Sequence, residues 1–203
     1  MSANPAFFIR RATPADQEAL YDICLWTAAS GEDATALYGD PRLPGYIWAA
    51  AYGALEPHFA FILDDGTGKA LGYVIGTRET AAFERRLDKE WWPDVRRKLS
   101  GFVPSRPLDA AALARIATPE AHDPSLAADY PAHLHINLLP PAQSGGWGRR
   151  MIETELEALR QAGVAGVHLG VSPTNHRAIG FYKHVGFEDL SRNGHVLFGM
   201  RFR

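Results

Sequence analysis

Apolar residues in the last third of the chain follow two different periods. Short runs rich in β-branched and apolar residues predict strands, at 133–139 (HLHINLL), 167–172 (VHLGVS) and 195–202. Between them, apolar positions recur every three or four residues, which predicts helices. These helices are expected at 147–162, stopping at Gly163, and from Thr174 or Asn175 to Gly186. This part of the chain therefore alternates strand and helix.

The preceding residues have a different pattern. Strands are predicted at Ala6–Arg11 and in a hairpin formed by His58–Leu63 and Ala70–Thr77 around the turn-rich segment DDGTGK. Helices are predicted at 14–29, with Thr13 as N-cap and Pro14 in the first turn, at 44–56, and at 80–99, where Pro93 should break the helix. Residues 101–132 carry five prolines and predict a long excursion with one or two short helices.

This order of elements predicts the fold class. Antiparallel pairing early and strand–helix alternation late indicate an α/β protein with a mixed sheet and helices on both faces, in one domain over residues 1–203. The 203 residues are 46% hydrophobic and 22% charged, which suffices for a sizeable core.

Charge and cysteine content narrow the function classes. The formal net charge of −2 argues against general nucleic-acid binding, and no apolar run approaches the length of a membrane span. Neither a secretory signal nor a disulfide is expected, because the N-terminus lacks a basic and apolar leader and Cys24 is the only cysteine. A cytoplasmic protein is the expectation.

The segment AQSGGWGRR, residues 142–150, joins a predicted strand to a predicted helix. Unpaired N–H groups of a first helical turn form an anion site, and glycines let a diphosphate approach the backbone. The expected donors are the amides from Ser144 to Arg149, with Arg149 and Arg150 adding charge. Neither a P-loop nor a dinucleotide-binding glycine motif is present; the spacing is instead Gln143-x-x-Gly146-x-Gly148. By itself this turn also fits a simple packing role.

A second motif follows the strand at 167–172. In NHRAIGFYKHVGF, Asn175, Ala178 and Tyr182 share one helix face, which places the Tyr182 hydroxyl at a cleft between the two strands. Phe181 points to another face and favours a core position.

Together, the segments LHINLLPPAQSGGWGRRMIETELEAL and VHLGVSPTNHRAIGFYKHVGFE resemble the GNAT acetyltransferases. More narrowly, YPAHLHINLLP and the closing segment resemble the acetyltransferase-like C-terminal domain of eukaryotic O-GlcNAc hydrolases and its bacterial relatives. No segment resembles the glycosidase domain, so glycoside hydrolysis is not implied.

The resemblance implies a GNAT fold: a mostly antiparallel twisted sheet whose central parallel strands splay apart at the cofactor site. It also implies an acetyl-CoA-binding half, 133–203, and an acceptor-side half, 1–132, with an insert at about 79–132. Acetyl-CoA would pair with the backbone of the strand, and an N–H near Leu138 or Leu139 would stabilise the acetyl oxygen. The implied contacts are Asn137, Leu138, Leu139, Gln143, Ser144, Gly145, Gly146, Trp147, Gly148, Arg149, Asn175, Ala178, Phe181, Tyr182 and Lys183.

Transfer to an amine requires an acid and a base. Tyr182 matches the position of the acid that protonates the leaving thiolate in the family. His133 and His135 alternate with Asn137 on one strand face and are candidate bases, although a structural role for both stays open. The glutamate that several relatives carry on this strand is missing. No nearby cysteine, histidine or acidic cluster completes a metal set with the histidines, so no metal is expected. The lack of G-x-S-x-G argues against a serine hydrolase.

The acceptor is expected to be a small amine or a peptide or protein amine, bound by the loop 30–46 and the segment 91–132. Acidic residues could attract it, and aromatic residues could line its pocket. The acidic candidates are Glu32, Asp33 and Asp40, and the aromatic ones are Tyr38, Tyr46, Trp48, Trp91 and Trp92. The family resemblance also allows a homodimer. The alternatives are a non-catalytic module that binds acetyl-CoA or a peptide, and an unrelated nucleotide-binding domain.

Overall fold

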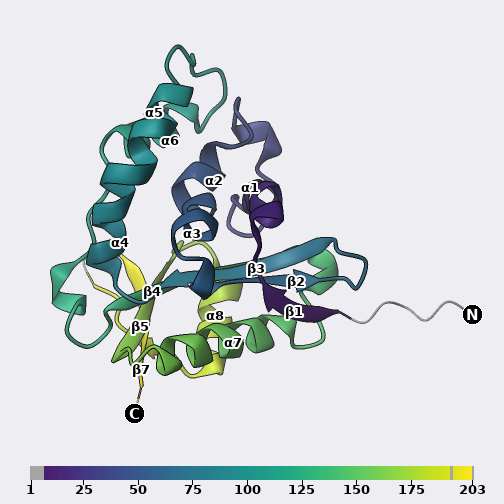
Figure 1. Cartoon of the computed structure of the whole chain (residues 1–203), viewed down its shortest axis with the longest axis vertical. Helices are drawn as coiled ribbons and strands as arrows, with labels where there is room; N and C mark the ends of the chain where they lie inside the picture. The colour runs from purple at the N-terminus through teal and green to yellow at the C-terminus, as the bar shows by residue number, and fades with distance from the viewer. Residues whose placement is uncertain (1–6, 193, 203) are drawn as a thin grey trace, which may run out of the picture.

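A computed structural model describes residues 7–192 and 194–202. Its seven-stranded sheet has the order β1-β2-β3-β4-β5-β7-β6 (Figure 1). The strands are β1 Phe8–Arg11, β2 Ala60–Asp64, β3 Ala70–Thr77, β4 Ala132–Leu138, β5 Gly166–Val171, β6 Glu188–Asp189 and β7 Val196–Arg201. Each strand predicted from the sequence is present within two residues of its expected bounds, apart from Ala6, which lies outside the described residues. The short β6 was not predicted.

The centre of the sheet holds one parallel pair, β4 and β5, and the other neighbouring strands are antiparallel. β4 and β5 pair only where Ala132 faces Val167 and His133 faces His168. The last five residues of β4 therefore have β3 on one side and no paired strand on the other. This confirms the predicted splay of the parallel strands.

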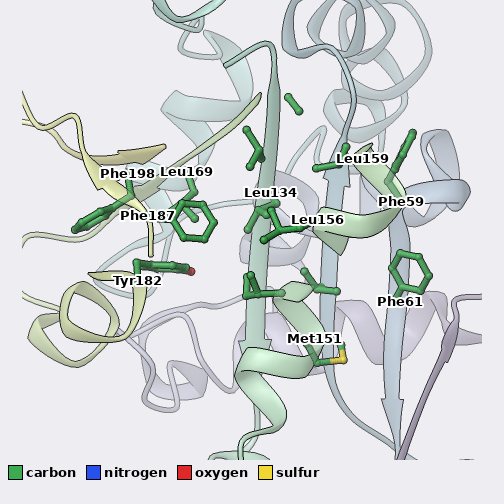
Figure 2. Close-up of a cluster of buried hydrophobic side chains, with 14 of the residues drawn as sticks. Phe59, Phe61, Leu134, Met151, Leu156, Leu159, Leu169, Tyr182, Phe187 and Phe198 are labelled. Carbon is green, nitrogen blue, oxygen red and sulfur yellow. The ribbon is translucent and has the colours of Figure 1, made fainter. Parts of the chain in front are cut away.

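Helices cover both faces, as predicted. On one face lie α7 Trp147–Gln161 and α8 His176–Val185; on the other lie α1 Gln17–Leu25, α2 Leu43–Trp48 and α3 Ala50–Leu55 (Figure 1). α7 presents a stripe at helical spacing to the sheet, formed by Met151, Ile152, Glu155, Leu156 and Leu159. Together with Leu134 and Leu169 of the sheet and Tyr182 of α8, its apolar members build one hydrophobic core (Figure 2).

The helices of the N-terminal part are more interrupted than the periodicity predicts. The first is a 3₁₀ turn, Pro14–Asp16, followed by α1, which ends at Leu25 rather than 29. The segment predicted as one helix at 44–56 is two, because Ala49 leaves helical geometry (φ −137°, ψ −56°). Further 3₁₀ turns are Thr35–Leu37, Pro57–Phe59, Pro124–Leu126 and Pro140–Ala142.

The predicted break near Pro93 takes an unexpected form. α4 Thr80–Arg86 continues into a π-helical stretch, Leu87–Trp91, and then into α5 Trp92–Lys98. Pro93 occupies the first turn of α5, where its missing N–H costs no hydrogen bond. The departure from α-helical geometry therefore lies in the π-helical stretch before Pro93 and not at the proline itself. Such π-helical turns occur often at functional sites.

The excursion at 101–132 contains α6 Asp109–Ala117, which packs with α2 and α5 in a separate hydrophobic cluster away from the sheet (Figure 1). The fully buried carboxylate of Asp109 anchors it. Asp109 accepts hydrogen bonds from the N–H groups of Gly39, Ser105 and Arg106 at 2.7–2.8 Å. Burial alone would raise its pKa, but these three amides hold the pKa below its usual range. The insert is thereby tied to the loop after α1.

Candidate functional site

A large cavity of about 1390 Å³ follows the open side of β4. One end is lined by the glycine turn and the first residues of α8, and the other by side chains from α3, α4 and α6 and the segment after α6. The predicted site residues that line it are His133, His135, Asn137, Leu138, Gln143, Ser144, Gly146, Trp147, Gly148, Arg149, Asn175, Ala178, Phe181 and Tyr182. Leu139, Gly145 and Lys183 do not.

Two different physical reasons favour glycine in this turn, namely backbone conformation and space. Gly145 and Gly146 have left-handed backbones, with φ of 68° and 76°, and Gly146 caps α7. That region is costly for residues with a β-carbon. Gly148 instead leaves room for a neighbour, since a β-carbon there would lie 3.3 Å from the Phe181 ring, which would have to shift by a few tenths of an ångström. The turn is thus specified by its glycines.

The amides of this turn are left open. Within the described residues, none of the N–H groups from Ser144 to Arg149 has a hydrogen-bond acceptor, and the first bonded amide of the helix is Arg150, which donates to Gly146 O at 3.1 Å. These six consecutive donors lie at the positive end of a fifteen-residue helix, and all of their residues except Gly145 line the cavity. This arrangement fits an anionic group such as a diphosphate.

Arg177 adds positive charge beside the turn, and the sequence interpretation missed it. Its guanidinium donates to Gln143 Oε1 at 2.5 Å and to Gln143 O at 3.3 Å. The Gln143 amide in turn donates to Leu138 O at 2.8 Å, so the side chain links α8, the turn and the end of β4. The sequence did contain a signal for this role: Arg177 lies two residues after the predicted N-cap Asn175, in the first turn of the helix.

The register of β3 and β4 determines which backbone groups of β4 face the cavity. Leu139 N–H donates to Leu71 O, and Asn137 pairs with Tyr73, so both point toward β3. Alternation directs the groups of Ile136 and Leu138 to the open side. Leu138 O already accepts from Gln143, which leaves the Leu138 N–H. The predicted backbone contacts at Asn137 and Leu139 therefore need correcting to Ile136 and Leu138.

Tyr182 extends from α8 with its hydroxyl directed toward β4 (Figure 2). Only 7% of the residue is exposed, and its hydroxyl has no hydrogen-bond partner within the described residues. Burial raises the pKa of the phenol, so the group stays protonated over the physiological range. The Asn175 side chain caps α8 by accepting from Ala178 N–H at 3.0 Å. Lys183, by contrast, turns away to pair with Asp189 at 3.3 Å.

His133 and His135 share one face of β4, as predicted, but differ in their partners. His133 is bonded at both ring nitrogens, to Tyr52 and Thr80. His135 has no hydrogen-bond partner within 7–192 and 194–202, and it lines the cavity. Burial is the main reason that the pKa of His135 falls to about 4, so its imidazole is neutral at physiological pH. His135 is thus the histidine with a free lone pair.

The acceptor-side predictions are met only in part. Glu32, Trp48 and Trp92 line the cavity, whereas Asp33 and Asp40 bind their own turns at Thr35 and Arg42. Tyr38 and Tyr46 are buried in the cluster around α6, and Trp91 donates to Tyr46 O. Charged residues that the sequence did not indicate line this end instead: Glu84, Asp88, Arg115 and Glu120. They come from α4, the π-helical stretch, α6 and the following loop.

The described residues contain neither a cluster of metal ligands nor a membrane-spanning helix. No group of three or more histidine, cysteine, aspartate or glutamate side chains is placed to hold a metal ion in that part of the chain. In the same residues, no helix has the length and apolar character needed to span a bilayer.

Comparisons with known proteins show the family and the fold. The model of the acetyltransferase (GNAT) family matches residues 20–187. The crystal structure of SsHAT superimposes with a TM-score of 0.89 at 40% identity, covering 97% of this chain and 98% of that one. A putative acetyltransferase from Salmonella typhimurium, yncA, solved with acetyl-CoA, shares the fold with a TM-score of 0.57 at 14% identity, covering 98% of this chain and 95% of yncA.

The narrower resemblance is also found. Protein O-GlcNAcase from Rattus norvegicus is 21% identical over 197 residues, which cover 93% of this chain and 21% of that protein. This chain therefore spans about a fifth of the length of that relative.

Proposed function

Because this chain belongs to the acetyltransferase (GNAT) family, we propose that it is an acetyl-CoA-dependent N-acetyltransferase that acts by direct attack of an amine on the acetyl group. The observation that carries this proposal is the row of amides from Ser144 to Arg149, which have no hydrogen-bond acceptor among the described residues and lie at the cavity along β4. Acetyl-CoA supplies an activated acetyl thioester when it is bound.

Each end of the site would bind a different part of acetyl-CoA. The turn amides and Arg177 would hold the diphosphate, and the backbone of Ile136 would pair with the pantetheine arm. The Leu138 N–H donates to the acetyl carbonyl as negative charge grows on its oxygen. We accordingly assign residues 133–203 to cofactor binding and 1–132, with the insert at about 79–132, to the acceptor.

Tyr182 and His135 handle the protons. Tyr182 gives its phenol proton to the departing sulfur, for which its neutral form at working pH is required. With its pKa near 4, His135 is too weak a base to deprotonate an alkylammonium of pKa about 10. The amine therefore enters neutral, and His135 receives the proton only after the nitrogen has attacked. Proton return from His135 to Tyr182 through solvent completes the cycle.

The acceptor is an amine on a small molecule or on a peptide or protein. The acids lining the far end of the cavity, Glu84, Asp88 and Glu120, support a cationic molecule. A cytoplasmic location and a homodimer remain predictions from the sequence.

Calorimetric titration with acetyl-CoA, followed by thiol release with an amine library, tests the proposal. We expect saturable binding and amine-dependent release of coenzyme A. Binding without release from any amine would support the non-catalytic module instead. Absence of binding would overturn both.

A further inference from the structure

A chain of three hydrogen bonds leads from a buried carbonyl to the acceptor end of the cavity. Thr80 Oγ1 lies 2.8 Å from Pro131 O and 2.9 Å from His133 Nδ1. His133 Nε2 lies 2.5 Å from the hydroxyl of Tyr52 on α3. Thr80 and Tyr52 are buried, and Tyr52 and His133 line the cavity.

For a neutral His133, only one placement of protons satisfies this chain. A carbonyl oxygen can only accept, so the Thr80 hydroxyl donates to Pro131 O. With its single proton used, Thr80 Oγ1 accepts from His133 Nδ1–H. The Nε2 of a neutral imidazole then carries a lone pair and accepts from the Tyr52 hydroxyl.

The neutral state of His133 follows from its surroundings. Its ring is packed against Tyr52, Phe83, His135 and His168, and no carboxylate of the described residues is bonded to it. Burial, together with the neighbouring histidines, puts the pKa of His133 well below its usual range. Protonation of Nε2, which would reverse the bond to Tyr52, is therefore disfavoured.

The consequence concerns the oxygen of Tyr52. Since its proton points to His133, only lone pairs remain for any group that enters the cavity. The ring is held in place by Phe83 and His135, with ring centroids at 4.5 and 5.5 Å. A fixed acceptor of hydrogen bonds thus stands beside the histidine that has a free lone pair.

We propose that Tyr52 positions the acceptor amine by accepting one of its N–H bonds, with His133 and Thr80 acting as positioning residues that keep the Tyr52 proton turned away. The inference rests on the proposed function and specifies its substrate. A neutral primary amine has two N–H bonds, one for Tyr52 and one whose proton His135 removes after attack. A secondary amine has one N–H bond and cannot satisfy both, so primary amines are the preferred class.

Long-range ¹H–¹⁵N spectra of the histidine rings read the proton positions directly, without any substrate. We expect the Nδ1–H form of His133 in the wild type and in Thr80→Ser. In Thr80→Val, which offers no acceptor to Nδ1–H, we expect the Nε2–H form. A His133→Asn variant assigns the signals. An Nε2–H or a charged His133 in the wild type would overturn the proposal.

Kinetics with a primary amine supply the second arm. In Tyr52→Phe and Thr80→Val, we expect kcat/KM for the amine to fall about tenfold, the effect of one hydrogen bond, and acetyl-CoA affinity to stay unchanged. Thr80→Ser should stay within about twofold of the wild type. Tyr21→Phe, a buried tyrosine that does not line the cavity, is the matched control.

The proposed function and the role of Tyr52 can be overturned separately. If the wild type releases no thiol with any amine, the proposed function itself fails. If the wild type turns over and Tyr52→Phe is equally efficient with primary amines, only the role of Tyr52 is overturned. The preference for primary over secondary amines should shrink in Tyr52→Phe, and an unchanged preference would also contradict that role.

Discussion

The two ends of the cavity are built from different parts of the chain. At the glycine turn, the functional groups are main-chain amides, left unpaired because a helix starts there. At the opposite end they are side chains from distant segments, such as Tyr52, Glu84, Arg115 and His135. The donors of the turn come from one short segment, whereas the acceptor end combines side chains from several helices and from the insert.

This difference has an energetic side. The turn amides donate hydrogen bonds without having to be ionised. They suit the diphosphate, which is the same in every coenzyme A substrate. The acceptor end mixes charged, aromatic and neutral imidazole groups whose ionisation depends on burial. Specificity can therefore change at the acceptor end while the cofactor end stays intact. Substitutions at each end should separate binding of the cofactor from turnover.

The largest effect is expected from a substitution that blocks the anion site at the cofactor end. Gly146→Glu places a carboxylate beside the six amides and a β-carbon on a left-handed backbone. Loss of two charge-assisted hydrogen bonds, each about 1.5–3 kcal/mol, should weaken acetyl-CoA binding roughly a thousandfold by calorimetry. Gly163→Glu, at φ 73° beyond the other end of α7 and equally free of neighbours, is the matched control. Equal affinities in the two variants would disprove the anion site.

Tyr182→Phe should leave that affinity intact and remove the proton donor. We expect kcat to fall about a thousandfold, within the range typical of general acids, while the dissociation constant of acetyl-CoA changes less than about twofold. Tyr130→Phe, a comparably buried tyrosine that does not line the cavity, controls for the loss of a phenol. Unchanged turnover in Tyr182→Phe would assign the protonation of sulfur to solvent.

His135 is proposed to accept the proton of the amine after attack. His135→Gln should lower kcat about a hundredfold, at the lower end of general-base effects because its basicity is weak. Since burial holds the pKa of His135 at about 4, the imidazole is neutral from pH 5 upward. The profile of kcat/KM should therefore rise toward the pKa of the amine without a step near 6.5. A step there that disappears in His135→Gln would contradict the lowered pKa.

Arg177 tests whether a side chain also contributes at the cofactor end. Arg177→Met removes one cation and the two bonds to Gln143, and should weaken acetyl-CoA binding about tenfold. Arg160→Met, an exposed arginine in the last turn of α7, provides the control. If both variants bind as the wild type does, the amides alone hold the diphosphate.

The same contrast explains what the sequence could predict. The glycine turn, the two helices beside it and the position of Tyr182 depend on residues close together in the chain, and they lie where expected. Asn137 and Leu139 were assigned to the wrong side because the direction of their amides depends on the pairing of β4 with β3, here Gly72 with Leu138. No pattern within β4 itself contains that register.

The two histidines illustrate the limit for side chains. Their alternation placed His133 and His135 on one face correctly. The distinction between them comes from Tyr52 and Thr80, which lie 81 and 53 residues from His133 in the chain. Likewise, the acids that line the acceptor end follow from the π-helical stretch and the packing of α6, which helical periodicity cannot anticipate. Arg177 alone had a local signal.

The smallest effect on catalysis is expected at Glu155, which lies on α7 but serves neither end of the cavity. Its side chain is fully buried, and within the described residues neither carboxylate oxygen has a hydrogen-bond partner. Burial raises the pKa of Glu155 well above its usual value of 4.5. The folded protein therefore retains a proton that the unfolded chain releases as the pH rises above 4.5, so folding becomes less favourable with increasing pH.

Glu155→Gln removes this proton uptake without a change of shape. The stability of the variant relative to the wild type should grow by up to about 1.4 kcal/mol per pH unit above 4.5, until the pKa of the folded state is reached, and vanish below 4.5. Urea unfolding at pH 4, 6 and 8 measures the difference, with the exposed Glu157→Gln as control. A constant difference at all three pH values would mean that Glu155 is ionised in the fold. An altered acetyl-CoA affinity would mean that the buried side of α7 influences its N-terminal turn, which lines the cofactor end of the cavity.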